Sequence, residues 1–203
     1  MLGKRETLEI DFKSIEPALS EIAANLEENL LEIMEGVTHI DRIQTRVKGL
    51  DSLVDKAQSK VDGKFKYNVP LKEIQDLIGA RIVVYYKGDV DVVREMVLKF
   101  YNTVEVHSFI PDSATKFGYE GFHTICNIPS PIYSGYRIDP LIPDFFELQV
   151  KTLYQHAWSQ ANHGLGYKPQ SKLSYDEERK LAFIAAQSWG ADSILSELTT
   201  KTH

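Results

Sequence analysis

The sequence predicts an α/β (α+β) fold, in which a sheet is flanked by helices and a further helix stands at each end of the chain. Three observations favour this class. Residues 146–151 alternate strictly between apolar and polar side chains, and the spacing becomes helical directly afterwards. Residues 79–86 form a run rich in branched and aromatic residues, which is typical of a buried strand. Apolar residues recur at three- and four-residue spacing near both termini.

The first expected element is a long amphipathic helix over residues 12–37. Its apolar residues fall on one stripe, and glutamates occupy the other side. The stripe consists of Ile15, Ala18, Leu19, Ile22, Ala23, Leu26, Leu30, Ile33, Met34 and Val37. It can serve as internal core or as a subunit interface, and nothing in it indicates chemistry.

A local excess of positive charge follows over residues 41–66, where seven lysines and arginines stand against four aspartates. A helix face exposed to solvent has the same composition, so that interpretation stays open. The spacing of the charged residues instead favours a phosphate-binding site. We expect Arg46 and Lys48 to lie in a loop before a helix that carries Ser52 and, on its second turn, Lys56. This arrangement can bracket a polyphosphate, because lysines act as point charges and a guanidinium can hydrogen-bond or stack on a base.

The run over residues 79–86 is expected to be a central strand that ends at residues 87–89 and precedes an amphipathic helix over residues 91–101. Gly79 predicts a close approach of the backbone to another group. Asp76 stands at the strand entrance, and Arg81 lies on the strand itself. An aspartate before a strand is usually a turn residue, so Asp76 alone carries little weight.

Two further strands are expected over residues 104–110 and 122–128, with a polar loop at residues 111–118 between them. Tyr119 lies where this loop meets the second strand. Its ring could stack on a nucleobase, or it could close the edge of the core. A loop with four prolines, residues 129–143, is expected to carry a short strand near residues 136–138.

The alternating strand presents Glu147, Gln149 and Lys151 on one face. Solvent is the simplest explanation of such a face. The next helix weakens this explanation, since it adds a polar set that could meet phosphate. That set is His156, His163 and Lys168, and the expected packing stripe of the same helix is Leu153, Ala157 and Ala161.

Beyond Pro169, the spacing of Ser174 and Glu177 predicts a capping box for a last helix over residues 174–198. Its expected stripe is Leu181, Ile184, Ala191, Leu195 and Leu198. We therefore expect one domain over residues 1–203, with a core at about 40–168 and helical extensions at 12–37 and 174–198.

Composition limits the function classes. The chain is 43% hydrophobic and 26% charged, which is typical of a globular domain. A net charge of −6 argues against a protein that coats long nucleic acid. The single cysteine, Cys126, excludes an internal disulfide and a multi-cysteine zinc site. No stretch predicts a membrane span or a signal peptide, so a cytoplasmic location is expected.

Four motifs stand in a particular order along the chain. They are Arg46-x-Lys48-x-x-x-Ser52-x-x-x-Lys56, Asp76-x-x-Gly79-x-Arg81, Gly118-Tyr119-x-x-x-His123, and Glu147-x-Gln149-Val150-Lys151-Thr152 with His156-Ala157-Trp158 and His163. Together they resemble the synthetase domain of the RelA/SpoT alarmone synthetases, and the length resembles a small stand-alone member. The resemblance covers about residues 46–168.

The resemblance implies a nucleotidyltransferase-like mixed β-sheet flanked by helices. It also implies transfer of the β,γ-pyrophosphate of ATP to the 3′-hydroxyl of GDP or GTP with Mg²⁺, releasing AMP. Asp76 and Glu147 would be the catalytic carboxylates that bind the metal, with Glu147 also polarising the attacking hydroxyl. Mg²⁺ usually binds one or two carboxylates together with phosphate oxygens, so this pair is sufficient.

The resemblance also assigns the two nucleotide sites. On the ATP side, Arg46 and Arg81 would sandwich the adenine and Lys48 and Lys56 would meet the phosphates, with Ser52 in the same motif. On the acceptor side, the implied residues are Tyr119, which would stack on the base, and His123, Lys116, Gln149 and Lys151. A homo-oligomer is expected, because small relatives often assemble. The hydrolase motif of the family is absent, so alarmone breakdown is not expected.

The chain departs from the family pattern on the acceptor side. Gly121 stands where a serine is usual, Lys151 where arginine is common, and Asn162 where an acidic residue often precedes the histidine. Two alternatives therefore stay open: transfer of pyrophosphate to another acceptor, such as an adenosine nucleotide or the 3′ end of tRNA, and a catalytically silent nucleotide-binding module. The intact pair of Asp76 and Glu147 counts against the silent module.

Overall fold

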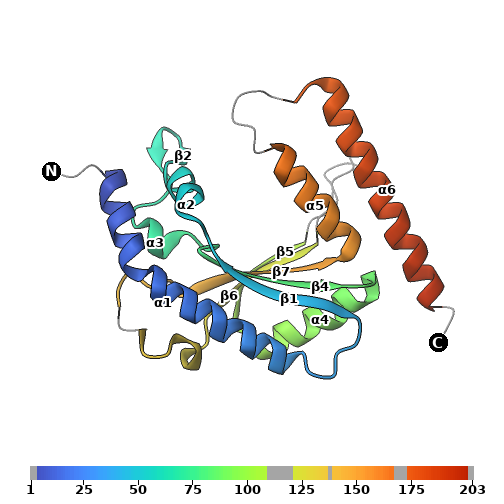
Figure 1. Ribbon diagram of the computed structural model, residues 1–203, viewed down its shortest axis with the longest axis horizontal. Helices are drawn as coiled ribbons and strands as arrows, with labels where there is room; N and C mark the ends of the chain where they lie inside the picture. The colour runs from blue at the N-terminus through green and yellow to red at the C-terminus, as the bar shows by residue number, and fades with distance from the viewer. Residues whose placement is uncertain (1–3, 109–120, 137–138, 167–172, 201–203) are drawn as a thin grey trace.

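The structure, a computed structural model, describes residues 4–108, 121–136, 139–166 and 173–200 (Figure 1). Its centre is a five-stranded mixed sheet in the order β1-β4-β7-β6-β5. The strands are β1 (Ile40–Val47), β4 (Ile78–Val84), β5 (Thr103–Ser108), β6 (Phe122–Asn127) and β7 (Phe145–Thr152). The central pair β4 and β7 is parallel, and the other pairs are antiparallel. The predicted fold class is confirmed.

Helices cover the sheet on both sides (Figure 1). On one side, α1 (Lys4–Ile33) and α4 (Lys87–Phe100) contribute to one buried core with the apolar residues of β4 and β7. On the other side lie α5 (Leu153–Gly166) and α6 (Tyr175–Thr200). None of the helices in the described ranges is both long enough and apolar enough to cross a membrane.

The first helix is confirmed, but it spans Lys4–Ile33 rather than residues 12–37. It begins at Lys4 because Leu8 and Phe12 extend the apolar stripe, and Phe12 is 1% exposed. Most of the predicted stripe is buried, whereas Ile33 and Val37 are half-buried. Between the stripe and the sheet there is one continuous core, so α1 acts as structural support for β1 and β4.

The prediction that Arg46 lies in a loop is wrong, because Arg46 is part of β1. Ile43 and Val47 face the core, while Gln44 and Arg46 project from the other face. This alternation was hidden within the run of charges. The predicted helix that follows is present as α2 (Leu50–Ala57), and Lys48 lies in the turn before it.

Small elements connect α2 to β4. They are a hairpin of β2 (Lys60–Val61) and β3 (Lys64–Phe65), and the short helix α3 (Pro70–Glu73). β4 then ends at Val84, and α4 begins at Lys87 rather than at residue 91. The earlier start has a local cause, because the Asp89 carboxylate accepts a hydrogen bond from the backbone N–H of Tyr86 (3.1 Å).

The strands predicted at residues 104–110 and 122–128 are confirmed as β5 and β6 within the described residues. The strand expected near residues 136–138 is not found at Tyr136, and the next two residues lie outside the described ranges. The same loop instead contains the 3₁₀ turn η1 (Ser130–Tyr133).

The stripes predicted for α5 and α6 are partly wrong. Ala157 and Ala161 are exposed, whereas Trp158 is 9% exposed and packs with Ala185 of α6. On α6, Ile184 is 44% and Leu198 is 55% exposed, and the buried residues are instead Ala185 and Asp192. The two helices pack on each other, so the larger side chains of α5 turn toward α6.

The predicted capping box of α6 is confirmed. The Glu177 backbone N–H donates to the Ser174 hydroxyl (3.4 Å), and the Ser174 backbone N–H donates to the Glu177 carboxylate (2.8 Å).

Candidate active site

The strand register brings most of the predicted polar residues to one face of the sheet. Gly79 of β4 lies opposite Arg46 of β1 on one side and Glu147 of β7 on the other. In the next row, Arg81 lies opposite Gln149, which is also the partner of His123 on β6. Since directly paired residues share a face, these side chains project together toward α5.

Asp76 is held by two lysines at the entrance to β4. Lys48 Nζ lies 2.9 Å from Asp76 Oδ2, and Lys56 Nζ lies 2.8 Å from Oδ1. Burial by itself would raise the pKa of Asp76, but the hydrogen bonds and charges of Lys56 and Lys48 outweigh it and hold the pKa below the ordinary value. The predicted polyphosphate-binding lysines and the predicted metal carboxylate therefore form one cluster.

Glu147 is a half-buried carboxylate at the centre of the polar face. Gln149 Nε2 donates to Glu147 Oε2 (2.9 Å), and His123 Nδ1 lies 3.6 Å from Oε1. Burial alone would raise its pKa, but the contacts with His123 and Gln149 lower it further than burial raises it. Glu147 is therefore ionised at neutral pH, as a metal ligand or a hydrogen-bond acceptor for a hydroxyl must be.

Arg81 and Arg46 lie close enough to repel each other. Burial lowers the pKa of Arg81, and the charge of Arg46 lowers it further. Arg81 donates to Gln149 Oε1 (3.0 Å) and lies 3.3 Å from His156 Nδ1. Among the described residues, buried Arg81 Nε has no hydrogen-bond partner. Two adjacent guanidinium groups gain from a ligand that is aromatic or anionic.

A cavity of about 280 Å³ opens above this part of the sheet. It is lined by Gln44, Thr45, Arg46, Gly79, Ala80, Arg81, Glu147, Gln149 and Gln160. The close approach predicted at Gly79 is not found within the protein, since a Cβ there would meet only the Arg46 side chain at 3.8 Å. The missing side chain of Gly79 instead leaves the floor of the cavity open.

His123 and Lys151 differ in what they offer to an acceptor. Buried His123 Nε2 makes no hydrogen bond to any described residue, so it is available to a ligand. Lys151 lies on the expected face but is only 4% exposed, and its Nζ donates to Ser159 of α5 (3.2 Å). Solvent therefore does not explain why Lys151 is polar, since its ammonium group is bonded within the protein.

The remaining predicted residues are placed only in part. Ser52 lies in the first turn of α2 and is half-buried. Lys116, Tyr119 and Lys168 lie outside the described residues, as does the side chain of His163.

Gln44 and Gln160 also line the cavity, and the sequence analysis did not predict them as site residues. Gln44 could have been found from the alternation of β1, because it lies two residues before Arg46. Gln160 could have been found from its position one helical turn after His156.

The donor set, two carboxylates, fits Mg²⁺. Among the residues that the structure describes, no group of three or more His, Cys, Asp or Glu side chains could hold a metal ion. Asp76 and Glu147 are near enough for the charge of Asp76 to act on the pKa of Glu147. Two carboxylates suit Mg²⁺ when phosphate oxygens complete its coordination.

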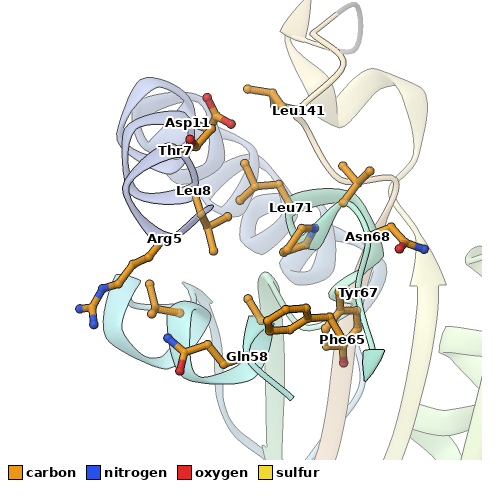
Figure 2. Close-up of a pocket in the computed structure, with 14 residues that line it drawn as sticks. Arg5, Thr7, Leu8, Asp11, Gln58, Phe65, Tyr67, Asn68, Leu71 and Leu141 are labelled. Carbon is orange, nitrogen blue, oxygen red and sulfur yellow. The ribbon is translucent and has the colours of Figure 1, made fainter. Parts of the chain in front are cut away.

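A second, larger cavity of about 550 Å³ lies away from these residues, between α1, α2, β3 and α3 (Figure 2). Most of its lining is apolar, including Leu8, Phe65 and Leu71, and Arg5 at its rim is paired with Glu9 (2.8 Å). It therefore lacks the charges that a polyphosphate requires, and the smaller polar cavity is the better candidate for the active site.

The fold and the polar face define a mixed-sheet protein in which two carboxylates lie close to a cluster of lysines and arginines. Residues 45–172 match the region found in RelA / SpoT proteins. The chain belongs to the RelA/SpoT family.

Individual relatives agree with this membership. The chain is 26% identical over 188 residues to the GTP pyrophosphokinase YjbM of Bacillus subtilis (strain 168), covering 89% of this chain and 83% of that protein. Small alarmone synthetase 1 from Bacillus subtilis has the same fold, with a TM-score of 0.77 at 21% identity over 94% of this chain and 97% of that one. A GTP pyrophosphokinase family protein from Streptococcus pneumoniae gives a TM-score of 0.73 at 20% identity, covering 94% and 93%.

Proposed function

We propose that the protein transfers the β,γ-pyrophosphate of ATP to the 3′-hydroxyl of GDP or GTP and releases AMP. The observation that carries the proposal is the single polar face on which Glu147, the Asp76 cluster and the two arginines meet. The relative YjbM is named a GTP pyrophosphokinase, in agreement with this reaction.

The ATP side is formed by β1, α2 and β4. Arg46 and Arg81 would hold the adenine between them, which relieves their mutual repulsion by placing a π-system between the two charges. Lys48 and Lys56 would turn from Asp76 toward the phosphates when ATP binds. One solved relative, small alarmone synthetase 1 from Bacillus subtilis, is described as bound to AMPCPP, an ATP analogue.

Asp76 and Glu147 would hold Mg²⁺ between them. When bound, the ion would neutralise charge on the transferred phosphates. Both Asp76 oxygens contact lysines, so two positive charges surround this carboxylate where the phosphates would bind.

Glu147 would act on the attacking hydroxyl. Its lowered pKa keeps it a carboxylate that can accept a hydrogen bond from the 3′-hydroxyl and orient it toward the β-phosphorus. The hydroxyl oxygen forms the new bond to that phosphorus, the bond from the phosphorus to the α,β-bridging oxygen breaks, and AMP leaves. The hydroxyl proton passes to Glu147 as the new bond forms.

The acceptor side would include His123 and Gln149, which flank Glu147, together with Lys116 and Tyr119 as proposed from the sequence. Lys151 would support this side by fixing α5 through Ser159. A relative, small alarmone synthetase 1 from Bacillus subtilis, is described as bound to its product pppGpp, which accords with a guanosine acceptor.

The test offers each acceptor separately. Purified protein is incubated with Mg²⁺ and ATP labelled at the γ-phosphate, with GDP, GTP, unlabelled ATP or deacylated tRNA as acceptor. The proposal expects label in the product from GDP or GTP. Label only on the adenosine nucleotide or on tRNA would favour the alternative acceptors, and no label with any acceptor would favour the silent binding module.

A homo-oligomer and a cytoplasmic location belong to the same proposal. The outer face of α6 exposes apolar side chains, with Phe183 at 62%, Ile194 at 59% and Leu198 at 55%. Exposed apolar area of this kind favours association with a second copy. Light scattering of the wild type and of Ile194→Glu tests it, because a monomeric variant and an oligomeric wild type are expected.

A further inference from the structure

Asp192 is a buried acidic residue on the inner face of α6, with no exposed surface. It accepts a hydrogen bond from the hydroxyl of Thr152, the last residue of β7, at 2.5 Å between the two oxygens. Thr152 is also fully buried. Burial of a carboxylate costs free energy unless the group is hydrogen-bonded. The contact between Asp192 and Thr152 offsets part of this cost, and it joins two elements that are far apart in the sequence.

Thr152 is the N-cap of α5. Its hydroxyl accepts a hydrogen bond from the backbone N–H of Gln155 (3.1 Å), and the Gln155 side-chain oxygen accepts one from the backbone N–H of Thr152 (2.8 Å). This is a reciprocal capping box. A hydroxyl has one proton and two lone pairs, so donating the proton to Asp192 leaves a lone pair directed at the Gln155 N–H. Asp192 therefore fixes the orientation of the cap.

The capped turn between β7 and α5 packs against the start of β6. A Cβ at Gly121 would lie 2.2 Å from the Val150 carbonyl oxygen, 2.8 Å from Lys151 Cγ and 3.2 Å from the Gln155 side-chain oxygen. The chain that enters β6 thus packs directly on the β7–α5 turn. Two residues further on, His123 contacts Glu147. The turn sets the position of His123 relative to Glu147.

Helix α6, which carries Asp192, also contacts the start of α4. Lys87 Nζ donates to Ser193 (2.7 Å), and the Lys87 backbone N–H donates to Ser196 (3.2 Å), so α6 caps the start of α4. Burial lowers the pKa of Lys87, while the charge of Asp192 raises it. Because β4 leads into α4 and β7 leads into α5, these contacts fasten α6 to the carboxyl ends of both central parallel strands.

We infer that Asp192 is a positioning residue for the acceptor nucleotide, acting through Thr152 and Gln155 on the start of β6. This inference rests on the proposed transfer to a guanosine nucleotide. The ATP-side residues Arg46, Lys48 and Lys56 lie on β1, the following connection and α2, whereas the bonds described above link Asp192, Thr152 and Gln155 to one another. The fourth ATP-side residue, Arg81 of β4, contacts α5 at His156 (3.3 Å) and Gln160 (3.4 Å). Disruption of the network should therefore affect the acceptor more strongly than ATP.

The experiment compares four substitutions in the full-length protein with Mg²⁺, ATP and GDP. Asp192→Ala and Thr152→Val remove the two sides of the bond, Thr152→Ser keeps the hydroxyl, and Asp176→Ala removes an exposed carboxylate from the same helix as a matched control. For Asp192→Ala and Thr152→Val, we expect kcat/KM for GDP to fall about tenfold or more, because a hydrogen bond to a charged group is lost. Thr152→Ser and Asp176→Ala should stay within about twofold of the wild type.

Two readouts separate positioning from general damage. In every variant, the Kd for AMPCPP measured by calorimetric titration should change much less than kcat/KM for GDP. The double variant Asp192→Ala/Thr152→Val should be no less active than the less active single variant, because both substitutions remove the same bond. Thr152→Val keeps the shape of the side chain, so it tests the inference even when Asp192→Ala fails to fold.

The inference is overturned if the variants weaken AMPCPP and GDP equally, or if they match the Asp176→Ala control. If the wild type transfers nothing to GDP or GTP, the proposed function fails, and this inference fails with it. If the wild type transfers label to GDP or GTP but the variants do not show the expected differences, only the positioning role of Asp192 is contradicted.

Discussion

Replacement of Glu147 by glutamine tests the chemistry at the centre of the sheet. The amide has nearly the same shape, and its carbonyl can still accept the hydrogen bond from Gln149. The substitution removes the negative charge that would hold the cation and accept the hydroxyl proton. We expect kcat to fall by about 10²- to 10⁴-fold, the usual contribution of a positioned acid or base.

The same substitution should leave the fold nearly intact. A neutral hydrogen bond replaces a charge-assisted one, which costs about 1 kcal/mol and lowers Tm by roughly 2–4 °C in a protein of this size. Initial rates of labelled pyrophosphate transfer and thermal unfolding are measured together with Glu95→Gln, an exposed glutamate of α4, as control. A Glu147→Gln protein with kcat close to that of the control would refute the role given to this carboxylate.

Three further outcomes follow from the structure. Lys48→Ala should raise the KM for ATP by about tenfold, more than Lys56→Ala, because the Lys48 side chain is 15% exposed and that of Lys56 is 36% exposed. Gly121→Ser should destabilise the protein by about 1–3 kcal/mol in urea unfolding, since its Cβ would overlap the Val150 carbonyl oxygen. Asp76 and Glu147 have lowered pKa values, so the stability that they contribute should be complete above about pH 5 and be lost as the pH falls below about 4.

Each outcome has a control and a contradicting result. For the lysines, equal KM values in both variants and the wild type would contradict a role in phosphate binding. For Gly121, Gly190→Ser on α6 is the control, since a Cβ there meets no atom within 4 Å, and equal unfolding midpoints would contradict the predicted overlap. For the carboxylates, an Asp76→Asn/Glu147→Gln protein should show a shallower acid slope, and an unchanged slope would contradict their assignment.

The alternation of β7 was sufficient to predict its two faces. Phe146, Leu148 and Val150 are all fully buried, as a strand with one apolar face requires. The identity of Glu147 as a site residue could be expected from the same pattern together with the family motifs. Its actual neighbours depend on strand register, which pairs it with Gly79, and no local signal determines a register between strands so far apart in sequence.

Other expectations failed because tertiary packing outweighs local pattern. Arg46 lies on a strand because Ile43 and Val47 alternate toward the core within a charged run. On α5, the side with Trp158 is buried and the alanines are exposed, because α6 packs on that side. Asp192 could not be predicted as buried, since a charged helix residue normally faces water and its partner Thr152 lies 40 residues away.

The most direct test of the central claim is the fate of both parts of ATP in one reaction. Wild-type protein, Mg²⁺, GDP and ATP labelled at both the β- and γ-phosphates are incubated, and the nucleotides are separated. We expect both labels to move together to a guanosine nucleotide while AMP appears in equal amount. Release of ADP, or label that never reaches the guanosine product, would contradict pyrophosphate transfer at this site.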